Sequence, residues 1–371
     1  MPIACRYKTE LGRQFCVSDC PANAPCGAFR FARVEKPEDL PPAEARVIDV
    51  ALLDLNHGWQ NLGHDSLVHA VLETSCDLLP LLERTGLALR VVSFAVRDHG
   101  MVPEGPGGRF GVYLGTGGPG HLDPRCNDGV GPFSQGIHEN PSWEAPAFAL
   151  FDAIRDDSDA ALFAVCHTFG VLCRWSGAAR PVARGEDKGG KLSGVLENLL
   201  TDEARRHPWF SRLAAELPGG RRLRILDNRL FDLIPGPGAP PAGFIPIGYE
   251  SEGEEPGEAL TMMELARDRG GVVPRIFGVN HHPEIVNRTR QMGILRQKLQ
   301  RGEVTQEWVQ ERIEILTRVY PDEDSEQRLH VTSDYTLLAP LRFHLYRQVR
   351  ERAENLGLPV ELREELALDL A

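Results

Sequence analysis

The sequence predicts an α/β fold built on a doubly wound, mostly parallel sheet. Apolar runs of strand length alternate with helix-length segments of helical period, and polar or glycine-rich loops follow several runs. Ligands bind beyond the carboxyl ends of such strands, so these loops are where a site is expected. Strands are predicted at 47–55, 87–96, 110–114, 160–165, 223–226, 260–265 and 275–279, the last two paired. Helices are predicted at 66–84, 143–155, 168–175 and 201–217.

The two ends of the chain differ from this central pattern. Residues 1–45 are predicted to be a loop-like, cysteine- and proline-rich arm, because several prolines would break any long element. Residues 46–290 are predicted to form the α/β domain, and 291–371 a C-terminal helical extension whose helices finish the core or pair subunits. Helices are expected there at 285–300, 305–319 and 337–352, and loops earlier at 235–246 and 250–258.

Composition and charge exclude several classes of protein. The chain has 371 residues, 42% of them hydrophobic and 25% charged, which is typical of a globular protein. A formal net charge of -12 argues against a general nucleic-acid surface. The first residues lack the apolar core of a secretory signal, and no apolar run is long enough to span a membrane. A cytoplasmic protein without a membrane or nucleic-acid partner is therefore expected.

Half of the eight cysteines lie near the start of the chain. Four thiolates could close a zinc site or hold an iron-sulfur cluster, but their spacing is not that of a repeated CxxC pair. Free thiols on a loop-rich arm are the preferred interpretation, and no cofactor is predicted. The four weak candidates for metal ligands are Cys5, Cys16, Cys20 and Cys26.

Cys166, His282 and Glu284 stand where an acyl-transfer site would need them. Cys166 follows the apolar run 160–165 and precedes a predicted helix, and such a strand-to-helix turn holds a nucleophile out of the sheet. His282 follows another apolar run, and an imidazole there could take the thiol proton and later return it to a leaving group. Glu284 could fix the tautomer of His282 and stabilise its cation. His281 competes for the role of base, since adjacent strand residues face opposite sides.

These stretches resemble the class I glutamine amidotransferase-like superfamily, whose nucleophile motif is G-x-C-x-G-x-Q and whose later motif is H-P-E. Residues 114–120 resemble the G-G-P-G loop of that family, and the three motifs occur in the family's order. The resemblance covers roughly 47–290 and implies a flavodoxin-like sheet. It also implies a catalytic triad of Cys166, His282 and Glu284, and an oxyanion hole made by the backbone amides of Gly118 and His167.

The acyl donor is left open, because Thr168 and Gly170 stand where the family has glycine and glutamine. The layout is also similar to homoserine O-acyltransferases, whose K-L-F-G-V-F-E-H segment resembles residues 191–198. Asn228 and Arg229 fall where those enzymes have a Ser-Arg pair, and another arginine follows the H-P-E motif at a similar offset. The predicted substrate-binding residues are Phe169, Asn228, Arg229 and Arg288.

Three functions follow as hypotheses. The first is amide hydrolysis or transfer through a thioester on Cys166, by a glutamine amidotransferase-like enzyme. The second is a homoserine O-succinyl- or acetyltransferase-like transfer from acyl-coenzyme A, and the third is a non-catalytic relative that binds a ligand. Nucleotide binding is disfavoured, because the glycine-rich loops carry no P-loop lysine followed by Ser or Thr. A small-molecule substrate is expected, and a homo-oligomer or a synthase partner is left open.

Overall fold

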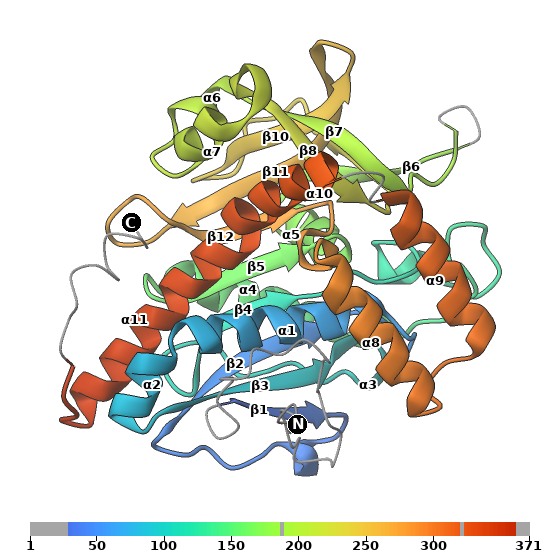
Figure 1. The fold of residues 1–371 in the computed structure, drawn as a ribbon. Helices are drawn as coiled ribbons and strands as arrows, with labels where there is room; N and C mark the ends of the chain where they lie inside the picture. The colour runs from blue at the N-terminus through green and yellow to red at the C-terminus, as the bar shows by residue number, and fades with distance from the viewer. Residues whose placement is uncertain (1–28, 186–188, 320–322, 361–371) are drawn as a thin grey trace.

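The computed structural model describes residues 29–185, 189–319 and 323–360 (Figure 1). Within these ranges one ten-stranded sheet dominates, and a two-stranded sheet lies beside it. The strands of the large sheet are β1 (Phe29–Val34), β2 (Val47–Asp54), β3 (Ala88–Ala95), β4 (Phe110–Gly115), β5 (Ala161–Val165), β7 (Gly194–Leu200), β8 (Arg222–Asp227), β10 (Ile245–Glu252), β11 (Glu255–Arg267) and β12 (Pro274–Val279). The small sheet pairs β6 (Ala179–Ala183) with β9 (Phe231–Pro235).

The large sheet has a parallel half and an antiparallel half. Its order is β1-β3-β2-β4-β5-β12-β11-β10-β7-β8. Every neighbouring pair from β1 to β12 is parallel, and every pair from β12 to β8 is antiparallel. Strands β5 and β12 therefore lie side by side and end at the same edge, so the residues that follow them, Cys166 and His282, come from adjacent strands.

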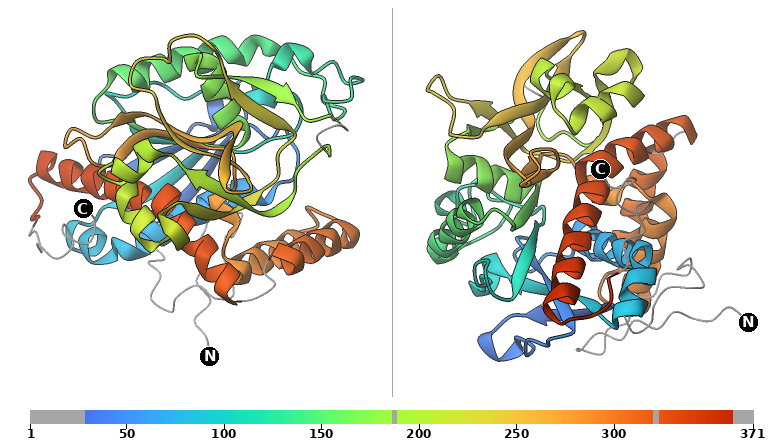
Figure 2. Two further views of the ribbon diagram at one scale, coloured as in Figure 1. Left: turned by 90° about the horizontal axis from the view of Figure 1, so that it is seen from above. Right: turned by 90° about the vertical axis from the view of Figure 1, so that its left-hand side faces the viewer.

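Helices cover both faces of the sheet, as Figure 2 shows. Helices α1, α2 and α11 lie on one face, and α4 and α5 lie on the other. Alternate residues of β2 enter the two cores: Val50 and Leu52 pack with the first group, and Ala51 and Leu53 with the second. The described helices are α1 (Leu62–Asp77), α2 (Leu79–Thr85), α3 (Val96–His99), α4 (Glu144–Asp156), α5 (His167–Ser176), α6 (Asp202–Arg206), α7 (Phe210–Glu216), α8 (Arg288–Gln300), α9 (Gln306–Val319), α10 (Glu323–Ser333) and α11 (Ala339–Asn355). The predicted α/β class with C-terminal helices is confirmed.

The prediction of a loop-like arm up to residue 45 is wrong for β1. This strand pairs in parallel with β3, and Phe29 and Phe31 bury their rings in the core. Two predicted helices are each broken into two. The helix at 66–84 is interrupted after Asp77, because Pro80 has no N–H to continue the helix and restarts it as α2. The helix at 201–217 is interrupted at Pro208 for the same reason.

The loop predicted at 250–258 is instead the tip of a hairpin. Strands β10 and β11 run antiparallel to it, and Glu252 pairs with Glu255 across the turn. The hairpin projects beyond the rest of the sheet at the top of Figure 1, so its acidic residues are solvated while its base is buried. The predicted pairing of strands 260–265 and 275–279 is confirmed, with Met262 opposite Val279.

Helix α11 completes the core of the parallel half. Its Leu341, Leu345 and Val349 are fully buried with apolar residues of β2 and α1. A π-helical turn, Asp334–Leu338, joins it to α10. Among the described helices, none combines the length and the apolar character needed to cross a bilayer.

Replacing His344 of α11 is expected to change how stability depends on pH. Burial lowers the pKa of His344 to about 4, and its Nε2 lies 2.8 Å from the Pro274 carbonyl oxygen. In the unfolded chain this histidine takes up a proton near pH 6.5. The contribution of neutral His344 to the free energy of unfolding is therefore fully present above that pH and is lost as the pH falls towards 4. In His344→Gln the free energy of unfolding should fall less steeply between pH 6 and 5, by up to about 1.4 kcal/mol per pH unit.

Urea unfolding at several pH values measures this effect. His138→Gln changes an exposed histidine and serves as the matched control. Equal slopes in His344→Gln and the wild type would contradict the assignment.

Candidate active site

Cys166 lies at the turn between β5 and α5, where the chain leaves the sheet. Its φ of 49° and ψ of -101° are uncommon for a residue with a side chain. Such strained turns occur at nucleophiles, because they lift the side chain above the strand ends. The Cys166 amide donates to the Val279 carbonyl of β12 at 2.8 Å, and the Cys166 carbonyl accepts from Gly170 at 3.0 Å. The half-buried thiol is thereby fixed at the start of α5.

His282 and Glu284 lie just beyond β12. The His282 amide donates to the Leu226 carbonyl at 2.8 Å, which fixes this segment against the end of β8. Nδ1 of His282 is 2.8 Å from Oε1 of Glu284, and both side chains are buried. The carboxylate also lies at the start of α1, since a Cβ on Gly63 would be only 2.8 Å from Oε1. The dipole of that helix favours a negative charge there.

The His282 imidazole lies between a carboxylate and a thiol. Burial alone would lower the pKa of His282, but the charges of Glu284 and of a Cys166 thiolate outweigh it and raise the pKa well above its usual range. Nε2 is buried and makes no hydrogen bond of ordinary geometry within the described ranges. His281 differs, because burial lowers its pKa to about 3 and neither of its ring nitrogens has a partner among the described residues. The geometry therefore favours His282 as the base.

The loop after β4 passes directly over the thiol and the imidazole. A methyl group on Gly117 would lie 3.0 Å from Cε1 of His282 and 3.8 Å from Sγ of Cys166. A side chain here would crowd both reactive groups. Gly118 is equally restricted, since its methyl would lie 2.2 Å from the Leu55 carbonyl oxygen. Glycine at these two positions lets the backbone approach the site closely.

Buried side chains fix this loop in place. Oγ1 of Thr168 donates to the Thr116 carbonyl at 2.7 Å. Nη1 of Arg97 donates to the Pro119 carbonyl at 2.7 Å, and the same guanidinium donates to both oxygens of Glu139, at 2.6 and 2.7 Å. Arg97 and Glu139 are 42 residues apart in the sequence, so no local motif marks them as a pair.

The backbone amides of Gly118 and His167 are free to bind an oxyanion. Neither amide donates a hydrogen bond to any group in the described part of the chain. The His167 amide belongs to the first turn of α5, where N–H groups lack helical partners. The His167 ring is kept neutral, because burial and the charge of Arg97 lower its pKa well below its usual range. Their role as an oxyanion hole stays a prediction.

Gly118→Ala is expected to lower kcat by about 100- to 1,000-fold, because the added methyl displaces one of the two amides. Gly238→Ala is the matched control, since nothing lies within 4 Å of its added methyl. Steady-state rates with an activated ester measure the effect, and circular dichroism checks that both variants fold. Full activity in folded Gly118→Ala would exclude the Gly118 amide from catalysis.

A cavity of about 180 Å³ opens onto Cys166. Several of its polar lining residues, among them Gln135 and Asn280, were not predicted from the sequence. Oε1 of Gln135 accepts from the Gly120 amide at 2.7 Å, and Nδ2 of Asn280 is buried without a partner among the described residues. Gln135 has no motif around it, and only the fold brings it to the cavity, whereas Asn280 lies two residues before His282, beside the H-P-E motif. The lining also includes Trp59, Gln60, Asn61, Gly118, Leu122, His167, Lys191, Asn228, Arg229, Phe231, His282 and Arg312.

Two of the four predicted substrate-binding residues line this cavity and two do not. Asn228 and Arg229 line it. Phe169 is fully buried in the core, where a methyl on Gly278 would lie 2.5 Å from its ring, so the helical turn points it away from the cavity. Arg288 is exposed at the start of α8. Substrate contact by Phe169 or Arg288 is therefore not supported by the structure.

The charge of Arg229 is already balanced. Its guanidinium is buried and makes ion pairs with three carboxylates. The three partners are Asp227 at 2.9 Å, Asp232 at 3.1 Å and Glu250 at 2.5 Å. Arg229 therefore positions the segment after β8 and has little charge left for an anionic substrate.

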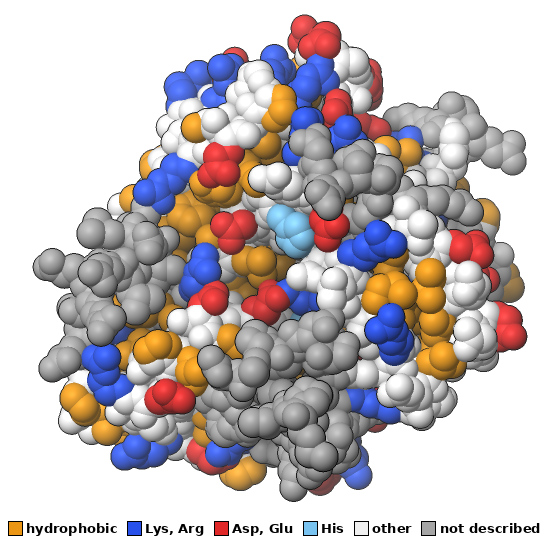
Figure 3. Space-filling model, viewed as in Figure 1, with side chains coloured by type: hydrophobic (Ala, Val, Ile, Leu, Met, Phe, Trp, Pro, Cys, Tyr) orange, Lys and Arg blue, Asp and Glu red, His pale blue; other side chains and the backbone are white. Residues whose placement is uncertain are grey.

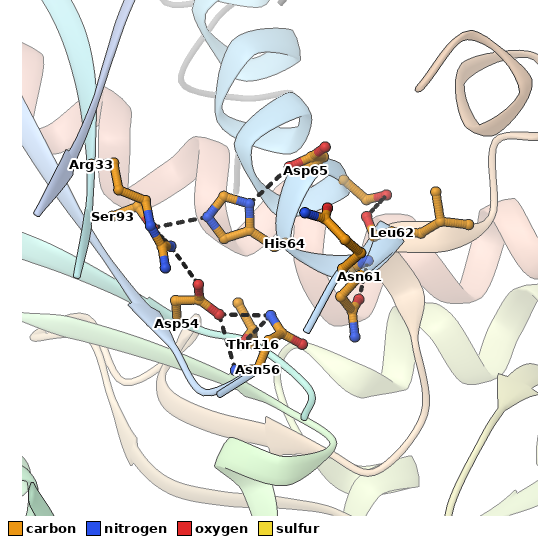
Figure 4. Close-up of polar contacts among 12 residues, drawn as sticks. Arg33, Asp54, Asn56, Asn61, Leu62, His64, Asp65, Ser93 and Thr116 are labelled. Carbon is orange, nitrogen blue, oxygen red and sulfur yellow. Dashed lines mark hydrogen bonds and ion pairs between the residues drawn. The ribbon is translucent and has the colours of Figure 1, made fainter. Parts of the chain in front are cut away.

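A second, polar cavity of about 150 Å³ lies on the other side of the loop after β2. Figure 4 shows its side chains around His64. Nδ1 of His64 lies 2.8 Å from Asp65, and Nε2 lies 2.8 Å from Ser93. Arg33 of β1 pairs with Asp54 at the end of β2. These contacts fix the start of α1 and the loop that separates the two cavities.

The four cysteines weighed as metal ligands fall outside the described residues, since all precede residue 29. Within 29–185, 189–319 and 323–360, no cluster of three or more His, Cys, Asp or Glu side chains could hold a metal ion.

No protein-family model matches the chain, and no curated protein matches it either. Among solved structures, it is similar to a glutamine amidotransferase from Thermotoga maritima, with 15% identity and a TM-score of 0.42 over 81% of this chain and 98% of that one. It is also similar to a glutamine amidotransferase from Methylobacillus flagellatus, with 12% identity and a TM-score of 0.44 over 85% of this chain and 98% of that one. At such identities a reaction or substrate does not carry over. Both similarities are in fold alone.

Proposed function

We propose that this protein is a cysteine-dependent, glutamine amidotransferase-like enzyme, which hydrolyses or transfers the acyl group of an amide through a thioester on Cys166. One observation carries the proposal. Cys166, His282, Gly118 and His167 border a single cavity, and Glu284 lies behind His282, 2.8 Å from its Nδ1. A core cysteine would have no need of this combination.

In the first half-reaction the Cys166 sulfur attacks the carbonyl carbon of the donor amide. A C–S bond forms, and the carbonyl oxygen becomes an oxyanion that the amides of Gly118 and His167 stabilise. When the oxyanion collapses, the C–N bond breaks and protonated His282 gives its proton to the departing nitrogen. Glu284 supports this step by stabilising the imidazolium.

In the second half-reaction water or an amine attacks the thioester. His282 takes the proton of the nucleophile, the C–S bond breaks, and the sulfur leaves as a thiolate beside the imidazolium. The raised pKa of His282 favours this ion pair between turnovers. Water gives net hydrolysis, and an amine gives transfer.

The donor need not be glutamine, because the positions after the cysteine are packed differently from the family motif. Thr168 is fully buried and bonds to the loop after β4. A Cβ on Gly170 would already lie 2.5 Å from the Leu122 side chain, so a glutamine there would not fit without repacking. Donor recognition must then rest on other lining residues, such as Gln135 and Asn280.

Transfer from acyl-coenzyme A is the second candidate. Lys191 and Arg312 line the cavity and would attract an anionic donor. Release of free coenzyme A, measured with a thiol reagent, distinguishes this donor from an amide. A protein that binds these donors without acylation would instead be a non-catalytic relative.

Mass spectrometry of the acid-quenched protein tests the proposal. The donor panel is glutamine, simple primary amides, acetyl- and succinyl-coenzyme A, and p-nitrophenyl acetate. At least one donor should add a single acyl group, mapped to the peptide that contains Cys166 and removed by hydroxylamine. Cys126 is exposed, so Cys126→Ala controls for non-specific acylation and should keep the label. Turnover with Cys166 unmodified at every quench time would overturn the proposal.

A further inference from the structure

A third cavity, of about 230 Å³, adjoins the one at Cys166. It lies between the end of β8, the turn Pro283–Ile285 and helix α9. The two cavities are neighbours, because six residues line both of them: Gln60, Asn61, Lys191, Asn228, His282 and Arg312.

The base borders both cavities, whereas the nucleophile borders one. His282 lines both, but Cys166, Gly118 and His167 line only the first. In acyl transfer the carbonyl must lie beside the thiol and the oxyanion amides, while the leaving or accepting group must lie beside the base. The cavity at Cys166 therefore suits the acyl part, and the adjoining cavity suits the acceptor.

The adjoining cavity is largely apolar. Leu226, Trp308, Ile315 and Leu316 line it, and Ile315 is 43% exposed although it is a large hydrophobic residue. Hydrophobic and basic side chains lie next to one another over α8 and α9 in Figure 3. An acceptor with an apolar body would cover these side chains, whereas ammonia or water would leave them exposed.

The polar groups of this cavity suit an amine and an acidic group. Asp227 is buried, and its Oδ1 has no hydrogen-bond partner among the described residues, so it could accept from an amino group next to His282. Lys191 is exposed and makes no ion pair within the described ranges, whereas Arg312 is 31% exposed and pairs with the exposed Glu311 at 2.6 Å. Both cations line the junction of the two cavities, where they could bind a carboxylate.

We propose that the acceptor is a primary amine with an apolar body and an acidic group, a class that includes the apolar α-amino acids. This inference rests on the proposed function, because the amine attacks the thioester on Cys166. The amine nitrogen forms a bond to the acyl carbon, its proton passes to His282, and the C–S bond breaks to release the thiolate. The product is an N-acylated amino acid.

Single-turnover partitioning tests the inference. Protein acylated by p-nitrophenyl acetate is mixed with phenylalanine, serine or phenethylamine at equal free-amine concentration, and N-acetyl products are counted by mass spectrometry per acyl-enzyme formed. Phenylalanine should give at least about tenfold more product than serine, from burial of its ring. Phenylalanine should also give at least about threefold more product than phenethylamine, because only phenylalanine has a carboxylate.

Two substitutions on α9 make a matched pair. Ile315→Asp places a charge in the acceptor cavity and should reduce the preference for phenylalanine over serine by at least about fivefold. Gln310→Asp introduces the same side chain at an exposed position that does not line the cavity, and should leave the preference unchanged. Both positions are solvent-exposed, so neither change is expected to prevent folding.

The outcomes separate this inference from the proposed function. Normal acylation followed by equal transfer to phenylalanine, serine and water would overturn the acceptor but not the enzyme. Acylation by p-nitrophenyl octanoate can also be compared in the wild type and Ile315→Asp. A slower acylation in the variant would mean that the cavity binds the acyl chain of the donor, and would overturn the inference. Titration calorimetry of Cys166→Ala with phenylalanine needs no acylation: binding weakened by Ile315→Asp supports the acceptor site, and no binding overturns it.

Discussion

Cys166→Ala is expected to lower kcat by at least about 10⁴-fold, because alanine has no sulfur with which to form the acyl-enzyme. The donor that acylates Cys166 most rapidly is the substrate for this measurement, and the variant should still bind it. The large effect follows from the loss of the covalent route, which leaves only binding and the two backbone amides.

Cys173→Ala is the matched control for this substitution. Cys173 lies in α5, the helix that begins after Cys166, and it is fully buried. Burial raises the pKa of the Cys173 thiol well above its usual range, so it stays protonated and inert. Its replacement should cost some stability from a small cavity and leave kcat of the folded protein unchanged. Activity that depends on Cys173 and not on Cys166 would refute the assignment of the nucleophile.

Glu284→Gln is expected to lower kcat by about 10³-fold while leaving the shape of the site nearly unchanged. The substitution removes the charge 2.8 Å from Nδ1 of His282, so the pKa of His282 should fall. His282 must be protonated to release the leaving group, and activity is lost as the pH rises through its pKa. The alkaline limb of the pH–rate profile should therefore move to lower pH.

The chain offers a matched control in a second buried His–Glu pair. Nε2 of His207 lies 3.0 Å from Glu264, both side chains are 1% exposed, and neither lines a cavity at Cys166. Glu264→Gln should lower the free energy of unfolding by a few kcal/mol, about 3–5 for a broken buried pair, without shifting the pH–rate profile. Equal effects of the two substitutions on kcat would mean that Glu284 is structural.

The sequence was most informative where local pattern and chemistry coincide. The run 160–165 ends at a cysteine and is followed by a helix, and β5, Cys166 and α5 form as that pattern predicts. The position of His282 was also predictable, because β12 is an apolar strand that runs parallel to β5. The antiparallel half was harder to predict. The tip of its hairpin, at 250–258, is charged and solvated, so its sequence lacks the alternation of buried and exposed residues that indicates a strand.

Residues whose roles depend on long-range packing could not be predicted. Phe169 follows Cys166 closely in sequence, but the helix turns its ring into the core. Asp227, Lys191 and Arg312 come from three separate segments and meet only because α9 packs beside the end of β8. Strand β1 was missed because its two arginines interrupt the apolar residues, in a region dominated by prolines.

The central claim, that the sulfur of Cys166 and the imidazole of His282 act as one acid–base pair, can be tested before any substrate is known. Histidine-selective ¹⁵N labelling and NMR titration, with His282→Gln to assign the resonance, give the pKa of His282 in the wild type and in Cys166→Ala. Because the thiolate charge helps to raise this pKa, it should lie well above 6.5 in the wild type and fall in Cys166→Ala. Identical titration of His282 in both proteins, or a midpoint below 6.5 in the wild type, would contradict the account.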